Sequence, residues 1–352
     1  MNIGVNFSYK LIASRGIARF IENILSNVQL TTNDKIHFFI PEQCQDFDSF
    51  DCPYDYNLVK LNSSNYFIFE HLKLPAAVKK FRISVLLNPA NTVPILKNTY
   101  WLTVIHDVIP FKLECKPFTK KWLVNVYMRY IMKKGISKSE NLVTVSEYSK
   151  TDIHSLNIKH KDITVVYNGF NHKTINNKAQ PIPELPKDYY FWLGGDGYNK
   201  NINLIKQLLI RKKVKYPLCV VGVKKDENVK ELESLGAKVF VNISDEKLAT
   251  LYKKAKVFIF PSLYEGFGIP ILEALHNKVP YILSSNRTSL PEVCGDSCHL
   301  FDPTNIEQAE QLINAAFNDK LESKLKTYKK QLSKFNWVKE AEKVSSLLKE
   351  YK

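Results

Sequence analysis

The sequence predicts an α/β protein built from two doubly wound, mostly parallel sheets, and three observations support this fold class. Short apolar or β-branched runs alternate with longer helical patterns along the whole chain, which is typical of parallel βαβ units. The 352 residues, 45% of them hydrophobic, suffice for two domains that each bury a core. The alternation breaks near the middle, where prolines and glycines gather and helical periodicity is lost.

The expected strands follow in order from this alternation. Those of the first half are 3–7, 35–40, 57–61, 83–88, 101–106, 142–146 and 163–167. Those of the second half are 189–194, 217–222, 238–242, 256–261, 280–284 and 298–301. Beyond residue 302 the pattern turns helical to the end, and its last part is amphipathic.

These elements set the expected domain bounds. We expect a first domain over 1–170, a linker over 171–187 and a second domain over 188–334. An amphipathic helix over 335–352 is expected to pack back on the first domain.

Composition excludes several protein classes. No stretch approaches the roughly 20 consecutive apolar residues that a membrane-spanning helix needs, and the first residues lack the pattern of a secretory signal. The six cysteines have no zinc-site spacing and predict reduced thiols. The D-x-D triplet at 46–48 follows no suitable strand and is interpreted as a solvated loop. We therefore expect a soluble, cytoplasmic protein without a bound metal.

The net charge of +15 favours a polyanionic partner, which is a nucleic acid, an anionic membrane surface or a phosphorylated substrate. The segment 116–138 holds seven basic and no acidic residues, interleaved with aromatic and aliphatic ones. It predicts either a helix that rests on anionic lipid or an ordinary helix with solvated lysines. The sequence shows no helix-turn-helix, RNA-recognition or zinc-finger pattern, so we do not expect a nucleic-acid partner.

The segment VFIFPSLYEGFGIPILEAL, residues 257–275, carries the most chemistry. A buried strand ends in a loop with Glu265 and Gly268, and Pro270 predicts the first helical residue. The glycine lets the backbone approach a ligand, and the helix start favours an anion. Glu273 is expected in the opening turn, so that two carboxylates face one cleft and accept hydrogen bonds from sugar hydroxyls.

At this point the chain resembles the retaining glycosyltransferases of family four, which have the GT-B fold of two facing Rossmann-like domains. The resemblance rests on the E-x7-E motif of Glu265 and Glu273, followed by SLPEVCGDS and FDP. Weaker matches are the Gly16 loop, IHDVIP, VTVSEYSK, NGF, a GG-x-G…KN stretch and the terminal FNW segment. Together these matches cover nearly the full chain.

The resemblance implies residue roles in donor binding. Glu265 contacts the hydroxyls of the transferred sugar, Glu273 the ribose, and Lys200 neutralises the diphosphate. The backbone around Gly268, Ile269 and Leu272 lines the pocket, and Gly16 and Gly195 belong to loops near the donor. The family usually has an arginine shortly before the lysine, where this chain has Gly-Asp-Gly at 195–197. We interpret Arg287, at the same sheet edge, as its replacement; a solvated loop arginine is the alternative.

In the first domain, the resemblance implies that His106 meets the donor sugar and that Ser146 and Glu147 face the acceptor. It implies no metal and no pyridoxal phosphate. It further implies front-face transfer with retained anomeric configuration, in which the departing diphosphate helps take the acceptor proton.

The predicted function is transfer of a hexose, mannose or rhamnose, from a nucleotide-diphosphate sugar in surface-polysaccharide synthesis, of the lipopolysaccharide or O-antigen kind. The acceptor is a glycan or a polyprenyl-diphosphate-linked sugar, which places the enzyme at the inner face of the cell membrane. A GT-B-fold sugar-nucleotide epimerase and a basic nucleic-acid-binding protein are the alternatives.

Overall fold

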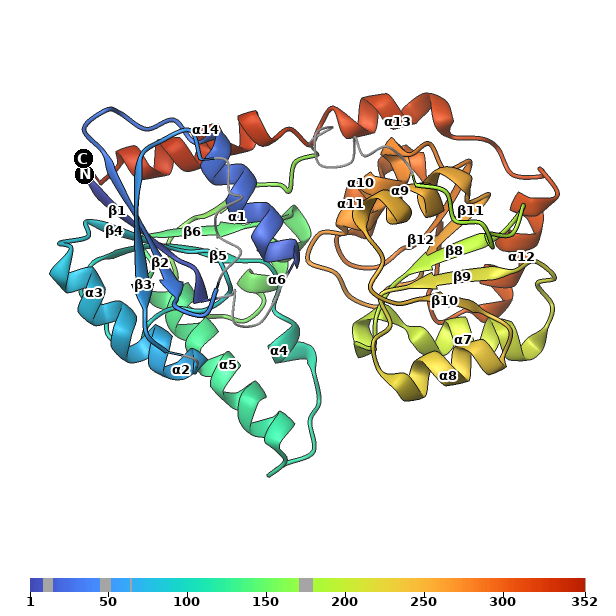
Figure 1. Cartoon of the computed structure of the whole chain (residues 1–352), viewed down its shortest axis with the longest axis horizontal. Helices are drawn as coiled ribbons and strands as arrows, with labels where there is room; N and C mark the ends of the chain where they lie inside the picture. Colours follow the sequence, from blue (N-terminus) through green and yellow to red (C-terminus); the bar gives the residue numbers. More distant parts are fainter. Residues whose placement is uncertain (9–14, 45–51, 64, 171–179, 352) are drawn as a thin grey trace. The chain divides into compact units, whose positions relative to one another are not determined.

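The computed structural model describes residues 1–8, 15–44, 52–63, 65–170 and 180–351, and it divides the chain into two compact units. Unit 1 comprises Met1–Gly169 and Asn336–Lys352, and unit 2 comprises Phe170–Phe335. Each unit is a parallel sheet with helices on both of its faces (Figure 1). The expected fold class is confirmed.

Unit 1 contains a sheet of seven parallel strands in the order β3-β2-β1-β4-β5-β6-β7. The chain order reverses between β1 and β4, so this pair forms the topological switch point. The strands are β1 (Asn2–Asn6), β2 (Lys35–Pro41), β3 (Tyr56–Leu61), β4 (Val85–Asn88), β5 (Tyr100–Ile105), β6 (Asn141–Thr144) and β7 (Ile163–Val165). The helices are α1 (Arg15–Asn27), α2 (Tyr66–Ile68), the π-helix η2 (Phe69–Lys73), α3 (Leu74–Lys80), α4 (Ile109–Lys112), α5 (Lys120–Lys138), α6 (Glu147–His154) and α14 (Trp337–Lys349).

Unit 2 contains a sheet of six parallel strands in the order β10-β9-β8-β11-β12-β13. Its switch point lies between β8 and β11. The strands are β8 (Tyr190–Leu193), β9 (Leu218–Val221), β10 (Lys238–Phe240), β11 (Val257–Phe260), β12 (Tyr281–Ser285) and β13 (His299–Phe301). The helices are η4 (Tyr198–Lys200), α7 (Ile202–Arg211), α8 (Asp226–Ser234), α9 (Asp245–Lys254), α10 (Ile269–His276), α11 (Leu290–Cys294), η5 (Gly295–Ser297), α12 (Ile306–Phe317) and α13 (Leu325–Leu332).

Apolar residues on both faces explain why these strands are central. In β8, Tyr190 and Trp192 join the core formed with α7, α8 and α12. Phe191 points to the other face and contacts the ring of Tyr252 on α9, with centroids 5.0 Å apart. A strand that is buried on both faces reads as a continuous apolar run, which is the pattern that identified it.

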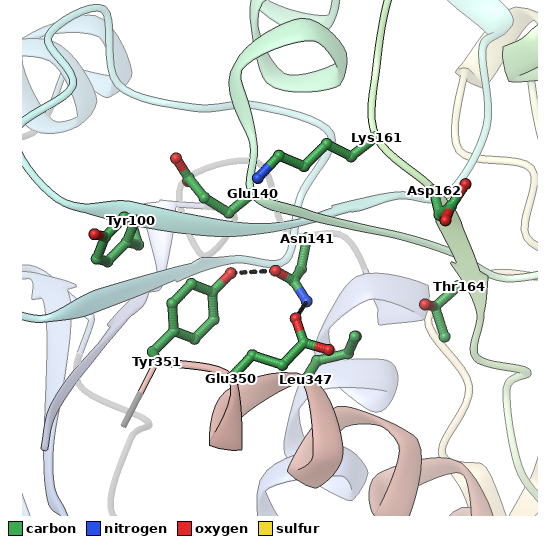
Figure 2. Close-up of a pocket in the computed structure, with 9 residues that line it drawn as sticks. All are labelled: Tyr100, Glu140, Asn141, Lys161, Asp162, Thr164, Leu347, Glu350 and Tyr351. Atoms are coloured by element: carbon green, nitrogen blue, oxygen red, sulfur yellow. Dashed lines mark hydrogen bonds between the residues drawn. The ribbon is translucent and has the colours of Figure 1, made fainter.

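Helix α14 completes unit 1. Asn336 caps it by accepting a hydrogen bond from the amide of Val338 at 2.8 Å. At the other end, Tyr351 Oη donates to Asn141 Oδ1 at 2.5 Å, and Asn141 Nδ2 donates to Glu350 Oε2 at 2.9 Å (Figure 2). Of the expected linker, 171–179 lie outside the described residues and the remainder belongs to unit 2, where Gln180 accepts a bond from Thr250.

Candidate active site

The loop between β11 and α10 carries the first of the predicted carboxylates. Gly268 precedes α10 with φ +112°, and a Cβ placed there would lie 2.6 Å from Leu290 Cδ2. Both the backbone angle and the space therefore require glycine. The helix begins at Ile269, so Pro270 is its second residue and not its first.

The loop after β12 holds the backbone of Glu265 in place. The Glu265 amide donates to Thr288 Oγ1 at 3.2 Å. The hydroxyl of Ser289, which is fully buried, lies 3.0 Å from the carbonyl of Glu265 and 2.8 Å from that of Phe267. These bonds fix the carboxylate at the carboxyl edge of the sheet, where open α/β sheets bind their ligands.

Lys200 is the partner of this carboxylate. Its Nζ lies 2.6 Å from Glu265 Oε1, and the two side chains keep 27% and 12% of their surface exposed. The ammonium also lies 5.6 Å from the ring centroid of Phe260. The pair is thus partly desolvated but still reachable by a ligand.

The chain around Lys200 is tied to the same loop. The Asn199 carbonyl accepts from the Leu263 amide at 2.8 Å. Asn201, which has φ +58°, donates through Nδ2 to the carbonyls of Pro261 and Pro303 at 3.1 and 2.8 Å. These bonds position the ammonium before any ligand arrives, which is the arrangement that electrostatic catalysis requires.

Asp196 organises the loop that carries the glycines at 194, 195 and 197. It accepts hydrogen bonds from Asn228 Nδ2 at 2.7 Å and from the amides of Lys224 and Lys225 at 2.9 and 3.1 Å. Desolvation alone would raise its pKa, but these bonds outweigh it and hold the pKa of Asp196 below its ordinary value. Asp196, which lies where the family usually has an arginine, therefore anchors α8.

The close backbone approach in this loop does not involve Gly195. A Cβ on Gly195 would lie 3.5 Å from the carbonyl oxygen of Gly222, which is ordinary contact. Gly222 has φ +98°, and a Cβ there would lie 2.5 Å from the carbonyl oxygen of Gly194. Sequence reasoning missed Gly222 because it counted this residue as the end of the expected strand 217–222, whereas β9 ends at Val221.

Glu273 lies deeper than expected. It is the fifth residue of α10, outside the first turn, and only 4% of its surface is exposed. Tyr252 Oη, from α9, donates to Glu273 Oε2 at 2.9 Å. The prediction that Glu273 lies in the opening turn is wrong because the helix begins one residue before Pro270. Leu272 is also fully buried, whereas Ile269 is partly exposed.

Arg287 is the second residue after β12, but its guanidinium points to other groups. Its Nη2 donates to Asp302 Oδ1 at 3.0 Å and to Thr304 Oγ1 at 3.2 Å. The bonds from Thr304 and the charge of Arg287 keep the pKa of Asp302 below its ordinary value. Within the described residues Arg287 contacts neither Lys200 nor Glu265, so its role as a substitute cation stays a prediction.

In unit 1, His106 directly follows β5. Its amide donates to Asn91 Oδ1 at 2.6 Å, and its Nε2 lies 2.7 Å from the carbonyl oxygen of Pro89. A carbonyl only accepts, so Nε2 carries the proton. Burial lowers the pKa of His106 to about 4, against the opposing effect of the Pro89 bond. In the described part of the chain Nδ1 has no partner, so the neutral ring presents an acceptor.

The other predicted residues of unit 1 start helices. Ser146 is fully buried and caps α6 by accepting from the Ser149 amide at 3.0 Å. Ser149 Oγ in turn donates to the His106 carbonyl at 3.3 Å. Glu147 is exposed in the first turn of α6. Gly16 was expected in a loop but is the second residue of α1; residues 9–14 before it lie outside the described residues.

A pocket of about 590 Å³ lies at the opposite edge of the unit 1 sheet, where β5, β6 and β7 begin. Figure 2 shows its lining, which includes Tyr100, Asn141, Thr164 and Tyr351. None of the sequence-predicted site residues lines it. The described residues hold no cluster of three or more potential metal ligands, and the triplet 46–48 falls outside them.

The comparisons with known proteins cover both units. The profile described as "Glycosyltransferase Family 4" matches residues 16–174, and that of "Glycosyl transferases group 1" matches residues 175–332. An O-antigen chain mannosyltransferase B from Escherichia coli is 29% identical over 67% of this chain and 66% of its own length. The O-antigen chain mannosyltransferase RfbU from Salmonella typhimurium is 30% identical over 55% of this chain and 54% of its own length. The chain thus matches less than two thirds of the length of these relatives.

Two solved structures have the same fold. A sucrose-phosphate synthase from Thermosynechococcus elongatus aligns with a TM-score of 0.75 at 14% identity, covering 99% of this chain and 98% of that one. The HepE protein of Anabaena, solved in complex with UDP, aligns with a TM-score of 0.71 at 12% identity, covering 99% of both chains. At these identities the likeness concerns the fold alone.

Proposed function

Because the chain belongs to the family-four glycosyltransferases, we propose that it transfers a hexose from a nucleotide-diphosphate sugar to a glycan or lipid-linked acceptor with retention of anomeric configuration. The observation that carries the proposal is the ion pair of Lys200 Nζ and Glu265 Oε1, which lie 2.6 Å apart. Gly268 precedes α10 in the same loop as Glu265. A cation, the start of a helix and a carboxylate at one sheet edge suit a diphosphate joined to a sugar.

The proposed chemistry divides the work between the two side chains. The bond between the anomeric carbon and the diphosphate oxygen breaks, and the bond to the acceptor oxygen forms on the same face of the sugar. The acceptor proton passes to the departing diphosphate. Lys200 stabilises the negative charge that grows on the diphosphate, and Glu265 orients the sugar by accepting from its hydroxyls while holding the ammonium. No step requires a metal, so transfer is expected to persist in EDTA.

We propose mannose as the transferred sugar, in preference to rhamnose. The support is that two of the matched relatives, aligned over 257 and 206 residues, are named O-antigen mannosyltransferases. Nothing favours an epimerase, because these relatives are transferases. The same names support surface-polysaccharide synthesis. An acceptor on a polyprenyl diphosphate belongs to the same proposal.

The test combines binding and turnover. The full chain is heated with GDP, UDP or dTDP, since a ligand that binds only the folded state raises the apparent melting temperature. The matching labelled sugar nucleotides are then supplied with a lipid-linked acceptor. Anomeric configuration is read by NMR of the product. Transfer of mannose with retention supports the proposal; epimer formation, inversion, or no response to any nucleotide sugar overturns it.

We also propose that α5 brings unit 1 to the inner face of an anionic membrane. Phe118, Leu123, Val124 and Tyr130 are exposed, Phe118 to 89%, and Lys120 and Lys121 stand among them. Exposed apolar side chains next to lysines suit the boundary between lipid headgroups and acyl chains. Among the described residues, no helix has the length and hydropathy needed to cross a bilayer.

Flotation with vesicles separates this proposal from the alternative of a helix with solvated lysines. Binding is expected to vesicles rich in phosphatidylglycerol and not to phosphatidylcholine alone. Replacing Leu123 and Val124 by Ser should abolish flotation. Replacing the exposed Lys253 and Lys254 of unit 2 by Gln is the matched control and should leave it unchanged. Absence of binding at low salt would rule out the membrane surface as a partner.

A further inference from the structure

Five buried polar side chains gather where β1 and β4 end, at the switch point of the unit 1 sheet. Each has at most 2% of its surface exposed; they are Asn6, Ser8, Glu70, Asn88 and Thr92. They come from the ends of two strands, the loops that follow them and the π-helix η2. π-helical turns are rare and occur frequently at functional sites. None of these five residues was singled out from the sequence.

Glu70 is the centre of this cluster. Its Oε1 accepts from Thr92 Oγ1 at 2.7 Å, from Asn6 Nδ2 at 3.0 Å and from Ser8 Oγ at 3.4 Å. Its Oε2 has no hydrogen-bond partner among the described residues and lies 4.0 Å from His71 Nε2. Burying a carboxyl with one unsatisfied oxygen costs stability, which a purely structural core would avoid by using apolar side chains.

The bond to Thr92 connects Glu70 to His106. Thr92 directly follows Asn91, whose Oδ1 accepts from the His106 amide at 2.6 Å. In the same short loop, the Pro89 carbonyl accepts from His106 Nε2 at 2.7 Å. The loop 89–92 therefore fixes both the backbone and the tautomer of His106, and Glu70 holds the far end of that loop.

We propose that Glu70 is a positioning residue that acts through Thr92 and the loop 89–92 to keep His106 in its neutral, Nε2-protonated form with Nδ1 as the acceptor. The inference rests on the proposed function, because it assumes that His106 contacts the sugar that the enzyme transfers. Burial raises the pKa of Glu70, against the lowering effect of its hydrogen bonds with Thr92, Asn6 and Ser8. The property that the loop uses is the Oε1 acceptor, which lies 2.7 Å from Thr92 Oγ1.

Conservative and disruptive variants separate these properties. Glu70→Gln keeps an acceptor at the Oε1 position, whereas Glu70→Leu removes it. Thr92→Val removes the donor with little change of shape, and Thr92→Ser retains the hydroxyl. The matched control is Glu310→Gln in unit 2, another buried carboxylate, which lies 2.7 Å from Arg211 Nε.

Two measurements are made on the full chain. Imidazole 15N NMR reports the tautomer and pKa of His106 without any substrate, and steady-state kinetics report turnover and the KM for the sugar nucleotide. Glu70→Leu and Thr92→Val should lose the pure Nε2–H tautomer and lower kcat by about tenfold to a hundredfold, as small displacements of positioned groups do. Glu70→Gln, Thr92→Ser and Glu310→Gln should keep the wild-type tautomer.

The possible outcomes distinguish failure of the Glu70 inference from failure of the proposed function. If folded Thr92→Val or Glu70→Leu keeps the wild-type His106 spectrum and kcat, Glu70 is only a core residue and the inference is wrong. If Glu70→Leu does not fold, the Thr92 pair decides alone. If the wild type transfers no sugar while the spectra change as expected, the proposed function fails and the coupling of Glu70 to His106 stands.

Discussion

Replacing Gly268 by alanine tests the backbone geometry at the start of α10. Gly268 has φ +112°, where a side chain adds strain of about 1–3 kcal/mol. The new Cβ would also lie 2.6 Å from Leu290 Cδ2, and Leu290 is fully buried, so its displacement adds about 1–3 kcal/mol more. Leu290 follows Ser289, which holds the Glu265 backbone, so the displacement reaches the proposed donor site.

A matched control isolates the steric part of this effect. Gly236 in the same unit has φ +93°, but a Cβ there meets nothing within 4 Å. Gly236→Ala therefore carries the strain alone. For a unit spanning Phe170–Phe335, each kcal/mol lowers the melting temperature by roughly 2–4 °C. By scanning calorimetry Gly268→Ala should melt roughly 2–12 °C below Gly236→Ala and respond less to the nucleotide that stabilises the wild type. Equal melting temperatures would refute the reasoning.

Three further substitutions have defined outcomes. Lys200→Ala should lower kcat by about 10²–10³-fold, because it removes the cation proposed to stabilise the departing diphosphate; a loss under about tenfold in steady-state assays would contradict this. Tyr252→Phe removes the donor to Glu273, so it should weaken nucleotide binding in titration calorimetry, whereas Tyr189→Phe, equally buried, should cost stability only. The folded pKa of His106 is about 4 and the unfolded value about 6.5, so acidification through this range favours the unfolded state. His106→Gln should reduce the stability lost between pH 8 and pH 5 by about 2 kcal/mol in urea denaturation, and an unchanged loss would show that the ring is not buried neutral.

The strands were predictable because burial on both faces leaves a direct trace in the sequence. All the expected strands are present, and most were extended by one or two residues beyond their ends. The residues that the expected strands wrongly included, such as His106, Ser146 and Pro261, are themselves buried or partly buried. The polarity of a residue therefore does not show where the last hydrogen-bonded pair of a strand lies. Sheet order was not predicted strand by strand, because crossover lengths alone do not determine which strands pair.

The site was predictable in composition but less so in geometry. The family resemblance singled out Lys200 and Glu265, yet no local pattern states that residues so distant in sequence form an ion pair. Glu273 was misplaced because the helix begins one residue earlier than expected, which puts this residue beyond the first turn of about 3.6 residues. One sequence feature marks Glu70, which is the only carboxylate in the largely apolar segment 66–74. Its hydrogen-bond partners, however, come from the ends of strands and the loops after them, far away in the sequence.

Helix α14 has a consequence for biosynthesis. Trp337 and Val344 of this helix are buried in unit 1, and the amide of Gln29 donates to Ser345 Oγ at 2.8 Å. A nascent chain must therefore release all of unit 2 from the ribosome before unit 1 can close its core. Until then the surface that awaits the helix stays open to chaperones and to aggregation.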